Sequence, residues 1–142
     1  MITDERKAHI FGVACLMKEY AIKLNLSTKE VEDYFLVGLL HDIGYEFLEE
    51  RGYPNHGNVG GLILKRQGFK FWKEIYYHGE VNCKYQSRLL DVLNCADMHI
   101  DYKGRRVSFD ERLKDISIRY NKPICELKEK QLVDELILKG YK

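Results

Sequence analysis

The stretch Val37-Gly38-Leu39-Leu40-His41-Asp42-Ile43-Gly44 is the segment around which the rest of the chain is organised. It is an apolar run that ends in an imidazole and a carboxylate standing next to each other. Burying a carboxylate without a compensating partner is costly. A cation would supply that partner, so His41 and Asp42 are candidate metal ligands.

The residues before this pair predict a buried helix. Ser27 and Glu30 form a capping box, in which the serine hydroxyl accepts from the backbone N–H of Glu30 while the glutamate reaches back to the serine N–H. The helix that follows is too apolar to lie on a surface, and Gly44 is placed to end it in the left-handed conformation that glycine tolerates. We therefore expect His41 and Asp42 in the last turn of a central helix.

Helical spacing of apolar residues extends over nearly the whole chain, which contains only two prolines, Pro54 and Pro123. The first helix is expected at about residues 3–24. We predict an all-α fold, a compact helical bundle of about six to seven helices that forms one domain over residues 1–142. The remaining helices are expected at about residues 59–67, 70–78, 86–102 and 108–120, and from Pro123 onward. A second capping box, Ser108 with Glu111, is expected to open the helix at 108–120.

Composition excludes several classes of function. Charged residues make up 32% of the 142 residues and apolar residues 45%, with a net charge of +1. That balance argues against general nucleic-acid binding and against a membrane-surface protein, both of which normally carry a basic excess. No stretch reaches the run of about 20 apolar residues that a membrane span requires. Four cysteines without a CxxC pair, read as reduced thiols, and the lack of a signal-peptide pattern predict a cytoplasmic protein.

Further imidazoles and carboxylates lie where they can join His41 and Asp42. His9 is at the edge of the first helix, where a surface histidine is the alternative. Asp97 falls inside the apolar face of the helix at 86–102, and this mid-helix position excludes a capping role. Side chains from different helices of a bundle can converge on its core and hold a metal. Imidazole and carboxylate ligands without thiolate suit iron, manganese, zinc or cobalt.

In this order the ligands resemble the HD-domain superfamily of metal-dependent phosphohydrolases. The family's pattern of His, then His-Asp, then a distal Asp maps onto His9, His41-Asp42 and Asp97, and Gly44 completes an HDIG sequence. The resemblance is strongest over residues 5–120. It implies a single HD-type helical domain, a divalent metal ion, Asp42 as the central catalytic residue and a metal-activated water that attacks phosphorus.

Two more histidines decide whether one or two metals bind. In dinuclear members of the superfamily, two histidines between the His-Asp pair and the last Asp hold a second ion, with the Asp of the pair bridging. His56, in the loop over residues 45–58, and His78, at the end of a short helix, resemble those positions. The alternative is a loop histidine and a histidine favoured by a helix C-terminus. The number of ions and the choice among Fe, Mn, Zn, Co, Ni and Mg stay open.

The chain departs from one group within the superfamily. Cyclic-dinucleotide phosphodiesterases of this type often carry a lysine shortly after HDIG and a His-His pair, where this chain has Tyr45 and Tyr77-His78. The GYP sequence of that group is present as Gly52-Tyr53-Pro54, but it precedes His56 instead of following the later histidines. A cyclic dinucleotide is therefore not the expected substrate.

Basic residues near the ligands are candidates for binding phosphate. Arg6 lies one helical turn before His9 and is the best single candidate. Lys103, Arg105 and Arg106 follow Asp97 closely and could act as charge-assisted donors, although a solvated turn is an equal alternative.

These observations lead to one main hypothesis and one alternative. The main hypothesis is a metal-dependent phosphohydrolase, without a choice between phosphomonoesterase and phosphodiesterase, that acts on a nucleotide-type phosphoester or phosphoanhydride. The alternative is a non-catalytic nucleotide-binding or regulatory module on the same fold. A structural metal site is disfavoured because such sites typically use cysteine-rich ligand sets. The expected partner is a phosphorylated small molecule, and the oligomeric state is open.

Overall fold

The computed structural model describes residues 2–48 and 55–142. Within those residues there are seven α-helices and two short 3₁₀ helices, and no β-strand, so the prediction of an all-α bundle is confirmed. In chain order the elements are α1 (Asp4–Lys23), α2 (Thr28–Leu40), η1 (Ile43–Glu46), α3 (His56–Arg66), α4 (Trp72–Tyr77), α5 (Arg88–Asp97), α6 (Phe109–Tyr120), η3 (Ile124–Glu126) and α7 (Lys128–Leu138).

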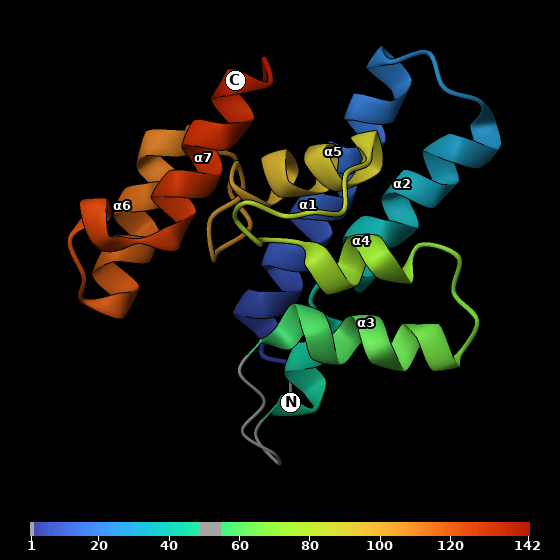
Figure 1. Ribbon diagram of the computed structural model, residues 1–142, viewed down its shortest axis with the longest axis horizontal. Coiled ribbons are helices and arrows are strands. Elements are labelled where there is room, and N and C mark those ends of the chain that lie inside the picture. Colours follow the sequence, from blue (N-terminus) through green and yellow to red (C-terminus); the bar gives the residue numbers. More distant parts are fainter. Residues whose placement is uncertain (1, 49–54) are drawn as a thin grey trace.

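The helices are arranged around α1 and α5. Helices α6 and α7 lie together on one side of this pair, whereas α3 and α4 pack against each other on the other side (Figure 1). Helix α2 packs along α1. Segments that are far apart in the sequence therefore meet where α1, α2 and α5 come together.

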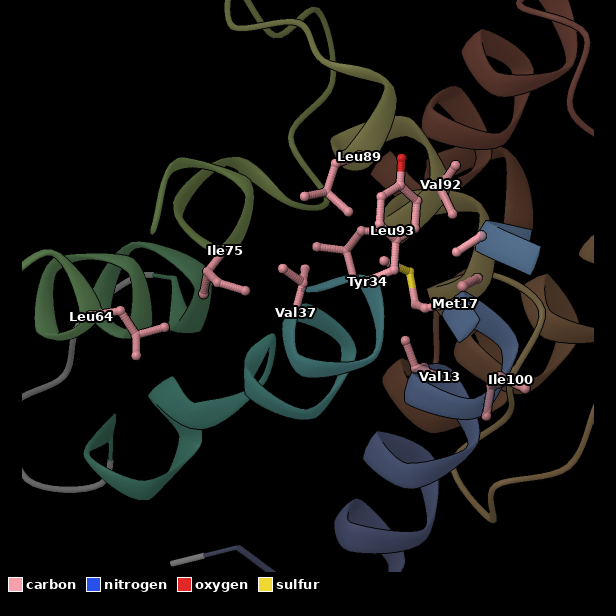
Figure 2. Packing of buried hydrophobic residues seen from close by; sticks show 12 residues of the cluster. Val13, Met17, Tyr34, Val37, Leu64, Ile75, Leu89, Val92, Leu93 and Ile100 are labelled. Carbon is pink, nitrogen blue, oxygen red and sulfur yellow. The ribbon is translucent and has the colours of Figure 1, made fainter. Parts of the chain in front are cut away.

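Two hydrophobic clusters hold this arrangement. The larger one joins α1 to α5, and Figure 2 shows Val13 and Met17 of α1 facing Val37 of α2 and Leu93 of α5. All four of these side chains are fully buried. The second cluster joins Cys95 of α5 to α6 and α7.

The packing of α2 on α1 depends on Gly38. A Cβ atom on this residue would lie 2.5 Å from the Cα atom of Ala14, closer than two carbons can approach. Only glycine at position 38 therefore lets α2 approach α1 this closely at Ala14. The contact places the end of α2, with His41, next to the His9 turn of α1.

The capping boxes at Ser27 and Ser108 are confirmed, but the end of α2 differs from the prediction. The helix stops at Leu40, so His41 is its C-cap and Asp42 precedes η1. Gly44 lies inside η1 and is not among the residues with positive φ. Its role is close approach, because a Cβ atom there would lie 1.9 Å from the carbonyl oxygen of His56.

Three further predictions of local structure were wrong. His56 is not in a loop: it is the first residue of α3, which Asn55 caps. Asp97 is the last residue of α5 and not a mid-helix residue. Pro123 precedes η3, and the last helix begins only at Lys128. The turn sequence at residues 52–54 lies outside the described residues.

All four cysteines are unpaired thiols, as predicted. Among the described residues, no helix combines the length and the apolar character needed to cross a membrane.

Candidate metal centre

The six side chains predicted as metal ligands gather at one place. Helix α1 contributes one of them, and the junction between α2 and η1 contributes two. One more comes from each of three places: the start of α3, the end of α4 and the end of α5. Most are deeply buried, and only the two at the rim have side chains more than 5% exposed, at 26% for His56 and 20% for Asp97. The six residues are His9, His41, Asp42, His56, His78 and Asp97.

One half of the cluster lies between α1 and α5. The Nε2 atom of His9 is 2.8 Å from Oδ1 of Asp97, and Nε2 of His41 is 3.6 Å from the same oxygen. Asp42 contributes one carboxylate oxygen to this half of the cluster. Its Oδ2 atom is 3.3 Å from Nε2 of His41 and 3.8 Å from Nε2 of His9. The ligand atoms of His9, His41 and Asp97 are close enough together to hold one metal ion.

The other half lies between α3 and the end of α4. The Oδ1 atom of Asp42 is 3.0 Å from Nε2 of His56 and 3.5 Å from Nε2 of His78. The two imidazole nitrogens are 3.0 Å from each other. Each oxygen of Asp42 therefore faces a different set of histidines, which is the geometry expected of a carboxylate that bridges two ions.

Backbone contacts fix the protonation of three of the rings. The Nδ1 atoms of His9, His41 and His78 lie 3.0, 2.6 and 2.6 Å from the carbonyl oxygens of Asp101, Gly38 and Ile75. A carbonyl only accepts, so each Nδ1 must carry the hydrogen. The Nε2 atoms of the three rings therefore face the cluster, so a metal ion bound there would meet their lone pairs, which is how metal-binding histidines are usually oriented.

The Nε2 atom of His41 shows that a cation fits this site. It is buried and has no hydrogen-bond partner among the described residues. An unsatisfied buried nitrogen normally costs about 1–3 kcal/mol. A metal ion placed between His9, His41 and Asp97 would satisfy it, and the nitrogen and oxygen donors suit a divalent transition metal.

The charges of the cluster also favour a cation. Burial opposes ionisation of Asp42, but the neighbouring imidazole of His41, with those of His56 and His78, holds the pKa of Asp42 well below its usual range. Burial acts on Asp97 in the same way, and His41 and His9 hold its pKa well below the usual range. Burial lowers the pKa of His56. Both carboxylates are therefore anionic at neutral pH.

An open cleft of about 590 Å³ leads from the cluster to the surface. The metal-ligand side of the cleft carries Arg6, whose Nη1 is 3.5 Å from Oδ2 of Asp42. Arg6 thus lies where it could reach a phosphate in the cleft, and its phosphate contact stays a prediction. The opposite wall is built by α6, η3 and the start of α7.

The other predicted phosphate contacts are not brought to this cleft. Lys103, Arg105 and Arg106 are exposed and do not line it. The guanidinium of Arg105 donates to Asp101 at 2.8 Å, and Arg106 pairs with Glu19 of α1. These side chains therefore contact Asp101 of the same turn and Glu19 of α1, and not the metal ligands.

Several basic residues of the cleft were missed by sequence reasoning. Arg112 is buried and donates through Nε to the backbone oxygen of Asp97 at 3.2 Å. Its spacing with Ile116 and Arg119, four and seven residues on, was the available signal for a shared helix face. The missed cleft-lining residues are Arg112, Arg119, Lys122 and Lys128.

The fifth histidine of the chain, His99, does not belong to the site. Its ring is half-buried and stacks on Phe109, with centroids 4.2 Å apart. Its Nδ1 atom is 2.8 Å from the carbonyl oxygen of Val107. The ring serves the packing of the turn after α5.

A comparison with family models gives one match, to the model described as the HD domain, over residues 6–136. The match extends beyond α6 into α7 and includes all six residues of the cluster. No curated protein and no solved structure matches the chain.

Proposed function

The chain belongs to the HD-domain family of metal-dependent hydrolases, and from that premise we propose that it hydrolyses a nucleotide-type phosphoester or phosphoanhydride. One observation carries the proposal. The two oxygens of Asp42 face two separate sets of histidine nitrogens, and a water-accessible cleft opens beside them. Such an arrangement suits two metal ions that together hold the attacking and leaving oxygens of a phosphoryl group.

Each ligand has a defined part in this proposal. His9, His41, Asp97 and Oδ2 of Asp42 would hold one divalent ion. His56, His78 and Oδ1 of Asp42 would hold a second. When bound, the ions supply a coordinated water of lowered pKa and a positive charge beside the phosphoryl oxygens.

The protein supplies the remaining positive charge. Arg6 is part-buried at the edge of the ligand cluster, with its guanidinium beside Asp42. Arg112 is buried and held by Asp115 at 2.8 Å as well as by the backbone of Asp97. Both guanidinium groups are fixed before substrate arrives, so they can stabilise developing negative charge on the phosphoryl oxygens without reorganising.

The test is metal content and turnover of the purified chain. Protein is prepared with Mn²⁺ or Fe²⁺, metal per chain is measured, and hydrolysis is followed with bis(p-nitrophenyl) phosphate, p-nitrophenyl phosphate and a panel of nucleotides. Asp42→Asn should lose more activity than the roughly 10–100-fold typical for a residue that only orients a ligand. Asp134→Asn, an exposed carboxylate on α7, is the matched control and should retain activity.

Two outcomes would overturn the proposal. A folded wild-type chain that binds no metal and turns over no substrate would exclude an enzyme. Tight nucleotide binding without hydrolysis, with metal supplied, would instead indicate a regulatory binding module. A measured ratio near one ion per chain would remove His56 and His78 from the ligand set.

A further inference from the structure

The arginine charge around the metal centre is concentrated on one side. Nη1 of Arg6 is 3.5 Å from Oδ2 of Asp42. Nη2 of Arg112 is 3.9 Å from Oδ1 of Asp97, the oxygen that also contacts His9. Within the described part of the chain, the other oxygen of Asp42 has ion-pair contacts with imidazoles only. An anion bound at the centre is therefore met by guanidinium groups on the His9 side.

A small hollow of about 50 Å³ continues this side of the centre between α1 and α6. It adjoins the main cleft, because several of its lining residues, His9 among them, line both spaces. One water molecule takes up about 30 Å³ of liquid volume, so the hollow has room for a small oxyanion and not for a nucleoside. Its described lining includes three arginines, Arg6, Arg112 and Arg119, and one carboxylate, Glu5.

The arginines of α6 are held in different ways. Arg112 is buried and pairs with Asp115 at 2.8 Å, so its position is fixed and part of its charge is offset. Arg119 pairs with no carboxylate of the described residues, and its Cζ atom lies 5.1 Å from the ring centroid of Tyr102, which also lines the hollow. An aromatic face holds a guanidinium without neutralising it. Arg119 therefore brings a full charge to a hollow whose described lining has Glu5 as its one acidic residue.

We propose that this hollow and its three arginines select a terminal phosphoryl group, one with a single substituent on phosphorus, as the group that is hydrolysed. This inference rests on the proposed function and names its substrate class. A terminal phosphoryl group has three unsubstituted oxygens and carries about −1.5 to −2 charges at pH 7. A phosphodiester has two such oxygens and a single charge. Only the terminal group offers enough oxygens and charge to meet the ligand cluster and the arginines together.

The size of the two spaces fixes the orientation of such a substrate. The hollow of about 50 Å³ takes phosphoryl oxygen, whereas the single substituent extends into the main cleft of about 590 Å³. Hydrolysis consumes one water: its oxygen stays on phosphorus, the P–O bond to the substituent breaks, and the leaving oxygen takes up a proton. The products are inorganic phosphate and the free alcohol of a monoester, or the shortened nucleotide of an anhydride.

The experiment compares two ligands that contain no hydrolysable bond to phosphorus. Phenylphosphonate has one substituent and is a dianion at mildly alkaline pH, whereas diphenylphosphinate has two substituents and is a monoanion. Each is titrated calorimetrically into the full-length chain with and without Mn²⁺. The proteins are the wild type, Arg6→Gln, Arg119→Gln and Lys114→Gln. Lys114 is an exposed lysine of α6 outside the lining of both spaces and serves as the matched control. Thermal unfolding checks that each variant is folded.

The expected result is a ratio of affinities. The wild type should bind phenylphosphonate roughly tenfold or more tightly than diphenylphosphinate, since one hydrogen bond to a charged group has about that effect. Arg6→Gln and Arg119→Gln should each remove most of this preference, and Lys114→Gln should keep it. Equal affinity of the wild type for the two ligands, or a preference left unchanged in either arginine variant, would overturn the proposal.

Turnover with the Mn²⁺-loaded chain separates this inference from the proposed function. If neither p-nitrophenyl phosphate nor bis(p-nitrophenyl) phosphate is hydrolysed but the binding preference and its loss in Arg119→Gln are seen, the anion site stands and the enzymatic proposal fails. If the diester is hydrolysed as efficiently as the monoester in both the wild type and Arg119→Gln, the enzymatic proposal stands and the selection of a terminal phosphate fails.

Discussion

The phenol ring of Tyr45 lies flat against the imidazole of His56, with ring centroids 4.2 Å apart and planes inclined by 17°. The Cζ atom of Arg6 is 3.6 Å from the centroid of the same phenol ring. At these distances the two groups cannot share one face of the ring, so Tyr45 is held between them. Tyr45 therefore holds in place both His56, the most exposed of the six ligands, and Arg6, which lies beside Asp42.

Replacing Tyr45 should weaken the His56 half of the centre. Tyr45→Ala removes the stacking surface, so His56 gains rotamers and we expect metal affinity at that half to fall roughly 10–100-fold. Tyr45→Phe retains the stacked ring and should bind metal like the wild type. Metal per chain at limiting Mn²⁺, measured by mass spectrometry, checks this. Equal metal content in Tyr45→Ala and Tyr45→Phe would contradict the role assigned to the ring.

Gly38→Ala should separate α1 from α2. The added methyl group would meet the Cα atom of Ala14 at 2.5 Å and its backbone nitrogen at 2.9 Å. Overpacking of this kind typically costs about 1–3 kcal/mol of unfolding free energy, and it should also lower metal affinity because His41 moves away from His9. The double variant Gly38→Ala/Ala14→Gly should not recover, since the clash is with backbone atoms. Recovery in a denaturant titration of the double variant would refute the packing argument.

Asp101 should contribute stability that depends on pH. Burial raises the pKa of its carboxyl group, but hydrogen bonds from the backbone and side chain of Arg105 outweigh burial and lower the pKa below the ordinary value of 3.8. A folded-state pKa lowered in this way gives stability that is fully present above pH 3.8 and is lost as the pH falls through the folded value. Asp101→Asn should cost about 1–3 kcal/mol at pH 7, and this difference should shrink below about pH 4.

The measurement for Asp101 is the free energy of unfolding of both proteins across pH 3 to 7, since acid denaturation reports the linkage directly. The backbone oxygen of Asp101 also accepts from Nδ1 of His9. Disturbing this turn should therefore loosen His9 and reduce Mn²⁺ affinity. A constant difference in stability over the whole pH range would disprove the charge-based explanation.

Metal should stabilise the fold, and acid should remove that effect. Free Mn²⁺ at 100 times its dissociation constant should add about 2.7 kcal/mol to the free energy of unfolding, and chelation should remove it. Protons compete with metal for imidazole nitrogen. Burial lowers the pKa of His41, but the carboxylates of Asp42 and Asp97 outweigh burial and hold it well above its usual range, so the gain should already decline as the pH falls from 7.5 to 5.5. Thermal unfolding with and without EDTA at pH 7.5 and 5.5 tests this. His41→Gln should show little gain at either pH.

The local pattern of the sequence determined the elements and the kind of ligand. The capping boxes at Ser27 and Ser108 depend only on residues three apart, and both form as predicted. Imidazole and carboxylate side chains in the family's order were enough to predict a divalent-metal site, because ligand chemistry follows from residue type. Helix ends were not determined in this way: α2 stops two residues before Asp42, and Gly44, expected to end it, instead lies in η1 against the start of α3.

The tertiary structure decided everything that depends on contacts between distant segments. His9 is oriented by the carbonyl of Asp101, 92 residues away, and Asp42 divides its two oxygens between helices that the sequence does not relate to each other. The same holds for the phosphate contacts. Nearness to Asp97 in the sequence pointed to Lys103, Arg105 and Arg106, whereas the packing of α6 along the cleft places Arg112 and Arg119 in its lining instead. A residue's chemistry is local, whereas the direction it faces is set by the whole fold.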